Sequence, residues 1–82
     1  MLHLVQSREG LAKCKAFVQS GDDVVFIGDG VICSEQFSDC RVFIQTDDAM
    51  RCGVPIGDES KYCDMAELVE LVALHDQSVS WS

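Results

Sequence analysis

The unbroken apolar run Val24-Val25-Phe26-Ile27, entered from Asp23, constrains the fold more than any other feature of the sequence. A strand with one face in water alternates apolar and polar residues, whereas a strand covered on both faces has no alternation, as in the middle of a parallel sheet. A second apolar centre lies in Arg41–Gln45. We therefore predict central parallel strands at residues 23–27 and at Arg41–Gln45.

The segments around these strands alternate between short apolar stretches and amphipathic ones. Three more strands are predicted, at Leu2–Val5, 61–63 and Ser78–Trp81. Predicted helical segments are one capped by Ser7, a short one at 31–37, one capped by Thr46 that ends near Cys52 before a break at 55–57, and one at 65–75. This order predicts an α/β three-layer sandwich with a mostly parallel sheet of about five strands and flavodoxin-like topology.

The chain length allows one domain, so we expect residues 1–82 to form a single unit. A domain of this size buries only about 60–65% of the surface that its unfolded chain exposes. Yet 48% of its residues are hydrophobic. The helix predicted at 65–75 is apolar almost all round, apart from Glu67 and Glu70, and we expect it to be covered on more than one side. Both features predict an oligomer.

The net charge of −8 argues against direct contact with nucleic acid, because such binding depends on Lys and Arg releasing counterions. No apolar run approaches the roughly 20 residues that span a bilayer, so we expect no membrane insertion. No leader sequence is recognised at Met1, and the cysteine count of five is odd. We therefore expect a cytoplasmic protein with free thiols.

Cysteine is the only reactive residue type in surplus. Cys14 lies on the apolar side of the first helix, where a small core residue is as good an explanation as a chemical role. Cys33 follows the strand at 23–27, at the edge where α/β folds bind ligands, and is an alternative nucleophile or persulfide carrier. No spacing suits a metal, and we expect neither a metal nor a cofactor.

Two other features allow a structural interpretation as well as a functional one. Gly28-Asp29-Gly30 resembles the start of a phosphate-binding loop, but it lacks a third glycine and carries an acid, so a turn is the simpler interpretation. A nucleotide- or small-molecule-binding module is therefore the third-ranked hypothesis. Each of the pairs Asp22-Asp23 and Asp47-Asp48 is interpreted as a solvated turn or as a partner of a helix dipole.

Five short segments in a fixed order resemble the DsrH/TusB family across nearly the whole chain. They are Met1-Leu2-His3, Gly21-Asp22-Asp23-Val24 leading into Asp29-Gly30-Val31, Arg51-x-Gly53, and Val79-Ser80-Trp81. The resemblance implies a DsrE/F/H-like fold and a place in a hetero-hexamer with DsrE/TusD-like and DsrF/TusC-like subunits. The chemistry that the resemblance implies for such a complex is persulfide transfer, in which this chain is expected to be a non-catalytic or accessory subunit.

In the TusBCD branch, the resemblance implies sulfur arriving from a TusA-like carrier and leaving to a DsrC/TusE-like carrier, for 2-thiolation of the tRNA wobble uridine. In the DsrEFH branch, a similar complex serves sulfur oxidation. We favour the first because that system is more widespread. The family's sulfur-accepting cysteine lies after the third strand of the DsrE/TusD subunit, where this chain has Thr46-Asp47-Asp48. Cys14 matches a cysteine of DsrH-branch members and is our candidate sulfur carrier.

Overall fold

The computed structural model describes residues 1–35, 37–54 and 61–82, and within them five strands form one parallel sheet. The strands are β1 (Leu2–Val5), β2 (Asp23–Phe26), β3 (Arg41–Gln45), β4 (Tyr62–Cys63) and β5 (Ser78–Trp81). Their order is β4-β3-β2-β1-β5, and each pairing is parallel. The predicted α/β sandwich with a five-stranded sheet is confirmed.

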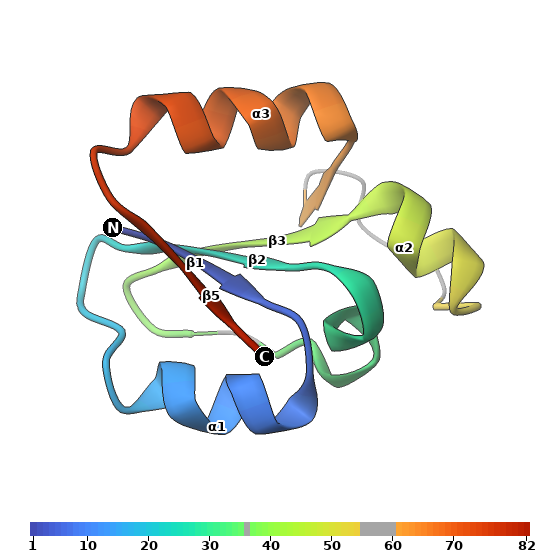
Figure 1. Ribbon diagram of the computed structural model, residues 1–82, viewed down its shortest axis with the longest axis horizontal. Coiled ribbons are helices and arrows are strands. Elements are labelled where there is room, and N and C mark those ends of the chain that lie inside the picture. The colour runs from blue at the N-terminus through green and yellow to red at the C-terminus, as the bar shows by residue number, and fades with distance from the viewer. Residues whose placement is uncertain (36, 55–60) are drawn as a thin grey trace.

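Helices cover both faces of the sheet (Figure 1). α1 (Arg8–Lys15) and the 3₁₀ helix η1 (Gly28–Cys33) lie on one face, α3 (Met65–Leu74) lies on the other, and α2 (Thr46–Arg51) lies beyond the end of β3. The chain steps from β1 to β2 to β3 in one direction and returns from β4 to β5 in the opposite direction. Because parallel crossovers are right-handed, the reversal puts α3 on the face opposite α1.

Side chains on the two faces of β2 pack into two separate hydrophobic cores, because successive side chains of a strand point to opposite faces of the sheet. Val24 and Phe26 pack toward α1, in the cluster completed by Val5, Leu11, Cys14 and Val31. Val25 packs toward α3, in the cluster completed by Leu2, Cys63 and Leu71. All four residues of β2 are buried, which is the reason its sequence shows no alternation.

The chemistry of the caps sets the helix boundaries. Ser7 caps α1 by accepting from the N–H of Gly10 at 3.0 Å, as predicted. Asp64 and Glu67 form a reciprocal capping box at the start of α3. The assignment of Thr46 as the cap of α2 was wrong. The Gln45 side chain accepts from the N–H of Asp48 at 2.8 Å, so the helix begins one residue earlier than predicted.

Two other helices differ from their predicted bounds. The helical segment predicted at 31–37 is η1, which begins at Gly28 because the first glycine, with φ of 55°, opens the turn. α3 ends at Leu74, and His75 is its C-cap with extended backbone. The break predicted at 55–57 lies outside the described residues.

Candidate functional site

Cys14, the predicted sulfur carrier, lies on the side of α1 that faces the sheet. Its exposed fraction is 0% and it belongs to the core cluster under β2. Burial, with smaller contributions from the neighbouring Cys40 and Asp22, raises the pKa of the Cys14 thiol to about 11. In this conformation the thiol is therefore protonated and enclosed, and a reaction at Cys14 requires α1 to move away from the sheet.

The other cysteines divide into one buried and three half-buried residues, and none of the five forms a disulfide. Cys63 lies under α3, where burial, with help from Glu67 and Asp64, raises its pKa to about 11. The Cys40 thiol donates to the carbonyl of Gln19 at 3.3 Å. The Cys33 thiol donates to the carbonyl of Gly30 at 3.2 Å, within η1. Cys33 is thus the predicted alternative that is not enclosed in a core.

The segment Thr46-Asp47-Asp48 is the first turn of α2, and its side chains hydrogen-bond to β4 and η1. The Thr46 hydroxyl donates to the carbonyl of Cys63 at 3.1 Å, and the Asp48 carboxylate accepts from the N–H of Gly28 at 2.8 Å. Arg51 lies 3.6 Å from both Asp48 and Asp29. These side chains tie α2 to β4 and to η1, and none of them is a thiol. The N–H of Gly28, which a phosphate would use, is already bonded to a carboxylate.

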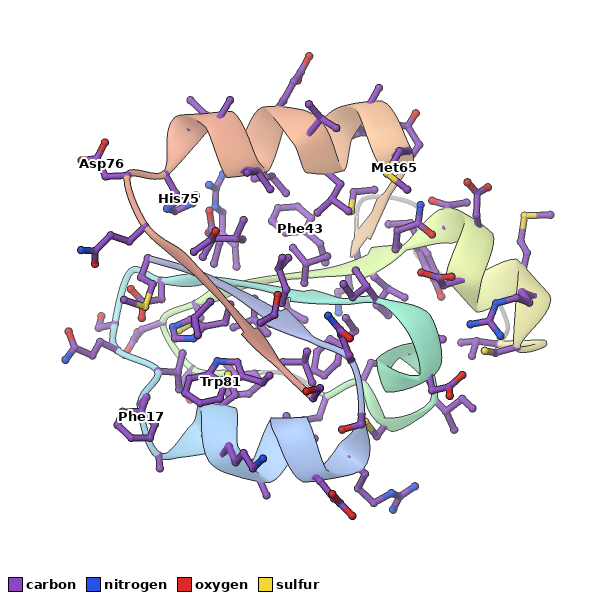
Figure 2. The ribbon with its side chains drawn as sticks, in the orientation of Figure 1. Phe17, Phe43, Met65, His75, Asp76 and Trp81 are labelled. Atoms are coloured by element: carbon purple, nitrogen blue, oxygen red, sulfur yellow. The ribbon has the colours of Figure 1, made fainter. Side chains whose placement is uncertain are left out.

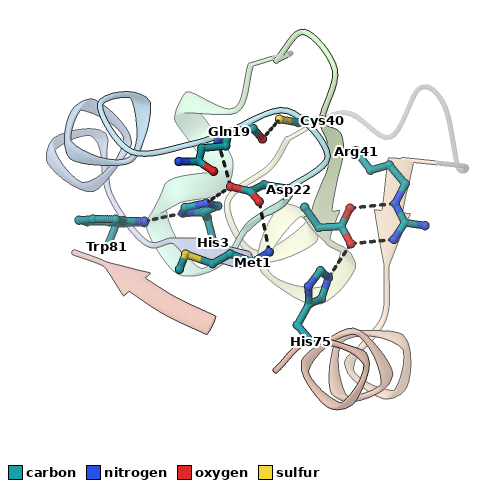
Figure 3. A network of polar contacts seen from close by, with 9 residues as sticks. Met1, His3, Gln19, Asp22, Cys40, Arg41, His75 and Trp81 are labelled. Carbon is teal, nitrogen blue, oxygen red and sulfur yellow. Dashed lines mark hydrogen bonds and ion pairs between the residues drawn. The ribbon is translucent and has the colours of Figure 1, made fainter. Parts of the chain in front are cut away.

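Asp22, which directly precedes β2, is hydrogen-bonded to His3, which is fully buried in β1 (Figure 3). Asp22 Oδ2 lies 2.9 Å from His3 Nε2, and Trp81 Nε1 donates to His3 Nδ1 at 3.0 Å. An indole N–H only donates, so Nδ1 accepts and the ring proton lies on Nε2, toward Asp22. Figure 2 shows Trp81 beside Phe17, and their rings stack at 5.4 Å.

Asp23 turns to the other face of the sheet and holds Arg41 and His75. Its carboxylate accepts from Arg41 Nε at 2.8 Å and from Arg41 Nη2 at 2.7 Å, and His75 Nε2 lies 2.7 Å away. Burial opposes its ionisation, but these partners lower the pKa of Asp23. The Asp23 side chain is 2% exposed. The interpretation of Asp22-Asp23 as a solvated turn was therefore wrong.

Sequence reasoning missed His3, His75 and Trp81 as members of these networks. One signal was present: a histidine inside the otherwise apolar strand Leu2–Val5 must find a polar partner when it is buried. In both networks the charged and aromatic side chains are hydrogen-bonded to one another. We therefore assign them to stability. Within the described ranges, no group of three or more His, Cys, Asp or Glu side chains is placed to hold a metal.

The outer face of α3 is apolar and uncovered. Met65, Val69 and Val72 share one side of the helix, at positions i, i+4 and i+7, and are 56%, 61% and 41% exposed. Leu74 is 76% exposed and lies on the side of Glu67 and Glu70. Only Leu71 of this helix is buried. Coverage of α3 on more than one side, predicted from its composition, is therefore absent within the described part of this single chain. None of the helices within residues 1–35, 37–54 and 61–82 is long and apolar enough to cross a membrane.

The family comparison agrees with the fold and with the resemblance of the sequence. A family described as "DsrH like protein" matches residues 6–78, which is most of the chain. No curated protein matches the sequence. The match supports the general role of a sulfur-relay subunit that works in a complex with DsrE- and DsrF-like subunits. The chain belongs to the DsrH family.

Proposed function

We propose that this chain is an accessory subunit of a TusBCD-like persulfide-transfer complex that supports 2-thiolation of the tRNA wobble uridine. In this role it assembles with DsrE/TusD-like and DsrF/TusC-like subunits into a hetero-hexamer. Sulfur enters from a TusA-like carrier and leaves to a DsrC/TusE-like carrier. The chain stabilises the assembly, while the accepting cysteine belongs to a sister subunit.

The observation that carries the proposal is the uncovered apolar face of α3. Isolated apolar side chains are common on protein surfaces, but several on one helix face are typical of a surface that another protein covers. Met65 and Val69, one turn apart on this face, expose 56% and 61% of their surface to water. A subunit interface over α3 removes this surface from water, at about 25 cal/mol per Å² of apolar area.

The segment Thr46-Asp47-Asp48, which follows β3, supports an accessory rather than an accepting role. It includes no thiol, and two of its side chains form hydrogen bonds to β4 and to η1. The net charge of −8 supports contacts with proteins in preference to tRNA. The chain therefore depends on its carriers to reach the RNA.

A DsrEFH-like role in sulfur oxidation is the second candidate, and Cys14 is the observation that favours it. This position matches the first-helix cysteine implied by the resemblance to DsrH-branch members. We propose Cys14 as the sulfur carrier of that alternative, with persulfide loading that waits for α1 to open because the thiol is fully buried. Loading of the whole complex, with Cys14→Ser beside the wild type, tests this role.

Deletion of the gene in its host separates the two branches. We expect the 2-thiouridine content of bulk tRNA, measured by nucleoside mass spectrometry, to fall and to return with the wild-type gene. The Cys14→Ser gene should restore it equally in the tRNA branch. An unchanged 2-thiouridine content with impaired growth on reduced sulfur compounds would assign the chain to sulfur oxidation.

A further inference from the structure

A groove between α1 and η1 opens beside Cys33, away from both polar networks. Its volume is about 500 Å³, within the range of small-molecule sites. The lining comes from α1 and from the end of η1 and the residues after it: Arg8, Leu11, Ala12, Lys15, Ile32, Cys33, Ser34 and Glu35. The groove thus combines an apolar wall, several polar groups and one thiol.

The charge of this lining is opposite to that of the chain. Arg8 and Lys15 supply two positive charges and Glu35 one negative charge, which leaves +1 in a protein of net charge −8. Glu35 is engaged by Lys15 at 2.8 Å. Among the residues that the structure describes, Arg8 forms no ion pair. An uncommitted guanidinium in a concave site attracts small anions.

The thiol of Cys33 is the nucleophilic group in this lining. It is half-buried, and its bond to the Gly30 carbonyl at 3.2 Å fixes the sulfur at the end of η1. Cys14 and Cys63, in contrast, are enclosed in the two cores. Partial exposure beside cations is the setting in which cysteines react.

We propose that this groove binds a small anionic hydropersulfide and that Cys33 takes its outer sulfur. The Cys33 sulfur attacks the outer sulfur of R–S–SH, a new S–S bond forms, and the S–S bond between the two sulfurs of the donor breaks. R–S⁻ leaves and takes up the proton released by Cys33. The products are Cys33–S–SH and R–SH, so no oxidant or reductant is consumed. The inference rests on the proposed sulfur-relay function and adds an entry point for sulfur from small molecules.

Two donors of matched length test it on the purified chain: the hydropersulfides of mercaptopropionate, an anion, and of cysteamine, a cation. Persulfides are trapped by alkylation and located by peptide mass spectrometry. We expect Cys33 to load about 25-fold faster from the anion, because one nearby charge in water attracts the anion about fivefold and repels the cation about fivefold. Arg8→Gln should remove most of that preference. Arg51→Gln, which changes an arginine outside the groove, and Cys52→Ser should leave loading at Cys33 unchanged.

An unloaded Cys33, or equal rates with both donors, would overturn the proposal. Cys33→Ser should still assemble with the sister subunits, since the groove lies on the α1 face and the exposed apolar surface is on α3. Failure of loading with intact assembly therefore refutes the role of Cys33 alone. Failure of the wild-type chain to assemble refutes the proposed function and leaves the loading result to stand by itself.

Discussion

Replacement of Asp23 by asparagine tests whether the buried carboxylate ties α3 and β3 to the start of β2. An asparagine keeps the volume but puts an amide N–H toward one of the donors, Arg41 or His75. Charge-assisted hydrogen bonds contribute about 1.5–3 kcal/mol each. The Arg41 side chain is 67% exposed, so water replaces part of what it loses, and we expect a total loss of about 2–3 kcal/mol in the free energy of unfolding.

For a chain of this length, that loss lowers Tm by about 10–15 °C. Circular dichroism during thermal and urea denaturation measures both quantities. Asp76→Asn is the matched control, because Asp76 is exposed, and it should change the free energy by less than about 0.5 kcal/mol. Equal stability of the two variants would show that the Asp23 network contributes nothing and would refute the reasoning.

Three further predictions concern acid, the α3 surface and a glycine. Burial alone would raise the pKa of Asp22, but hydrogen bonds from His3 and other donors lower it from 3.8 to about 2. The stabilising effect of the Asp22 carboxylate is therefore complete above pH 3.8 and is lost as the pH falls toward 2. Fluorescence of Trp81, the single tryptophan, measures acid unfolding. An Asp22→Asn variant with the same acid midpoint as the wild type would contradict this prediction. Val69→Glu should change the free energy of unfolding by less than about 0.5 kcal/mol yet abolish co-purification with the sister subunits, and retained co-purification would exclude this part of α3 from the interface. Gly10→Ala puts a Cβ against the backbone of β5 and should cost more than about 2 kcal/mol in urea denaturation, whereas a stable variant would mean that α1 shifts without penalty.

Much of the fold was predictable because its signals are local. The unbroken apolar run of β2 reports burial on both faces, and the pair Asp64 and Glu67 reports a capping box within four consecutive residues. The start of α2 was less predictable, because Gln45 and Thr46 both offer a side-chain acceptor and only the backbone geometry decides between them. The start of η1 depends in the same way on the positive φ of Gly28.

The candidate site was predictable only in part. The sequence identifies Cys14 and Cys33 as thiols on particular elements, but their exposure depends on packing that no local pattern encodes. The polar networks join residues far apart in the chain: His75 and Asp23 are 52 positions apart, and Trp81 and His3 are 78 apart. Such pairs follow from strand order, which brings β5 beside β1.

The most direct test of the account is the mass of the complex formed when the chain is co-expressed with its DsrE-like and DsrF-like sister subunits. Size-exclusion chromatography with light scattering should show one species that contains all three chains in equal amounts, with the mass of a hetero-hexamer. Elution of this chain as a separate monomer, while the sister subunits assemble without it, would contradict its role as a subunit of the relay.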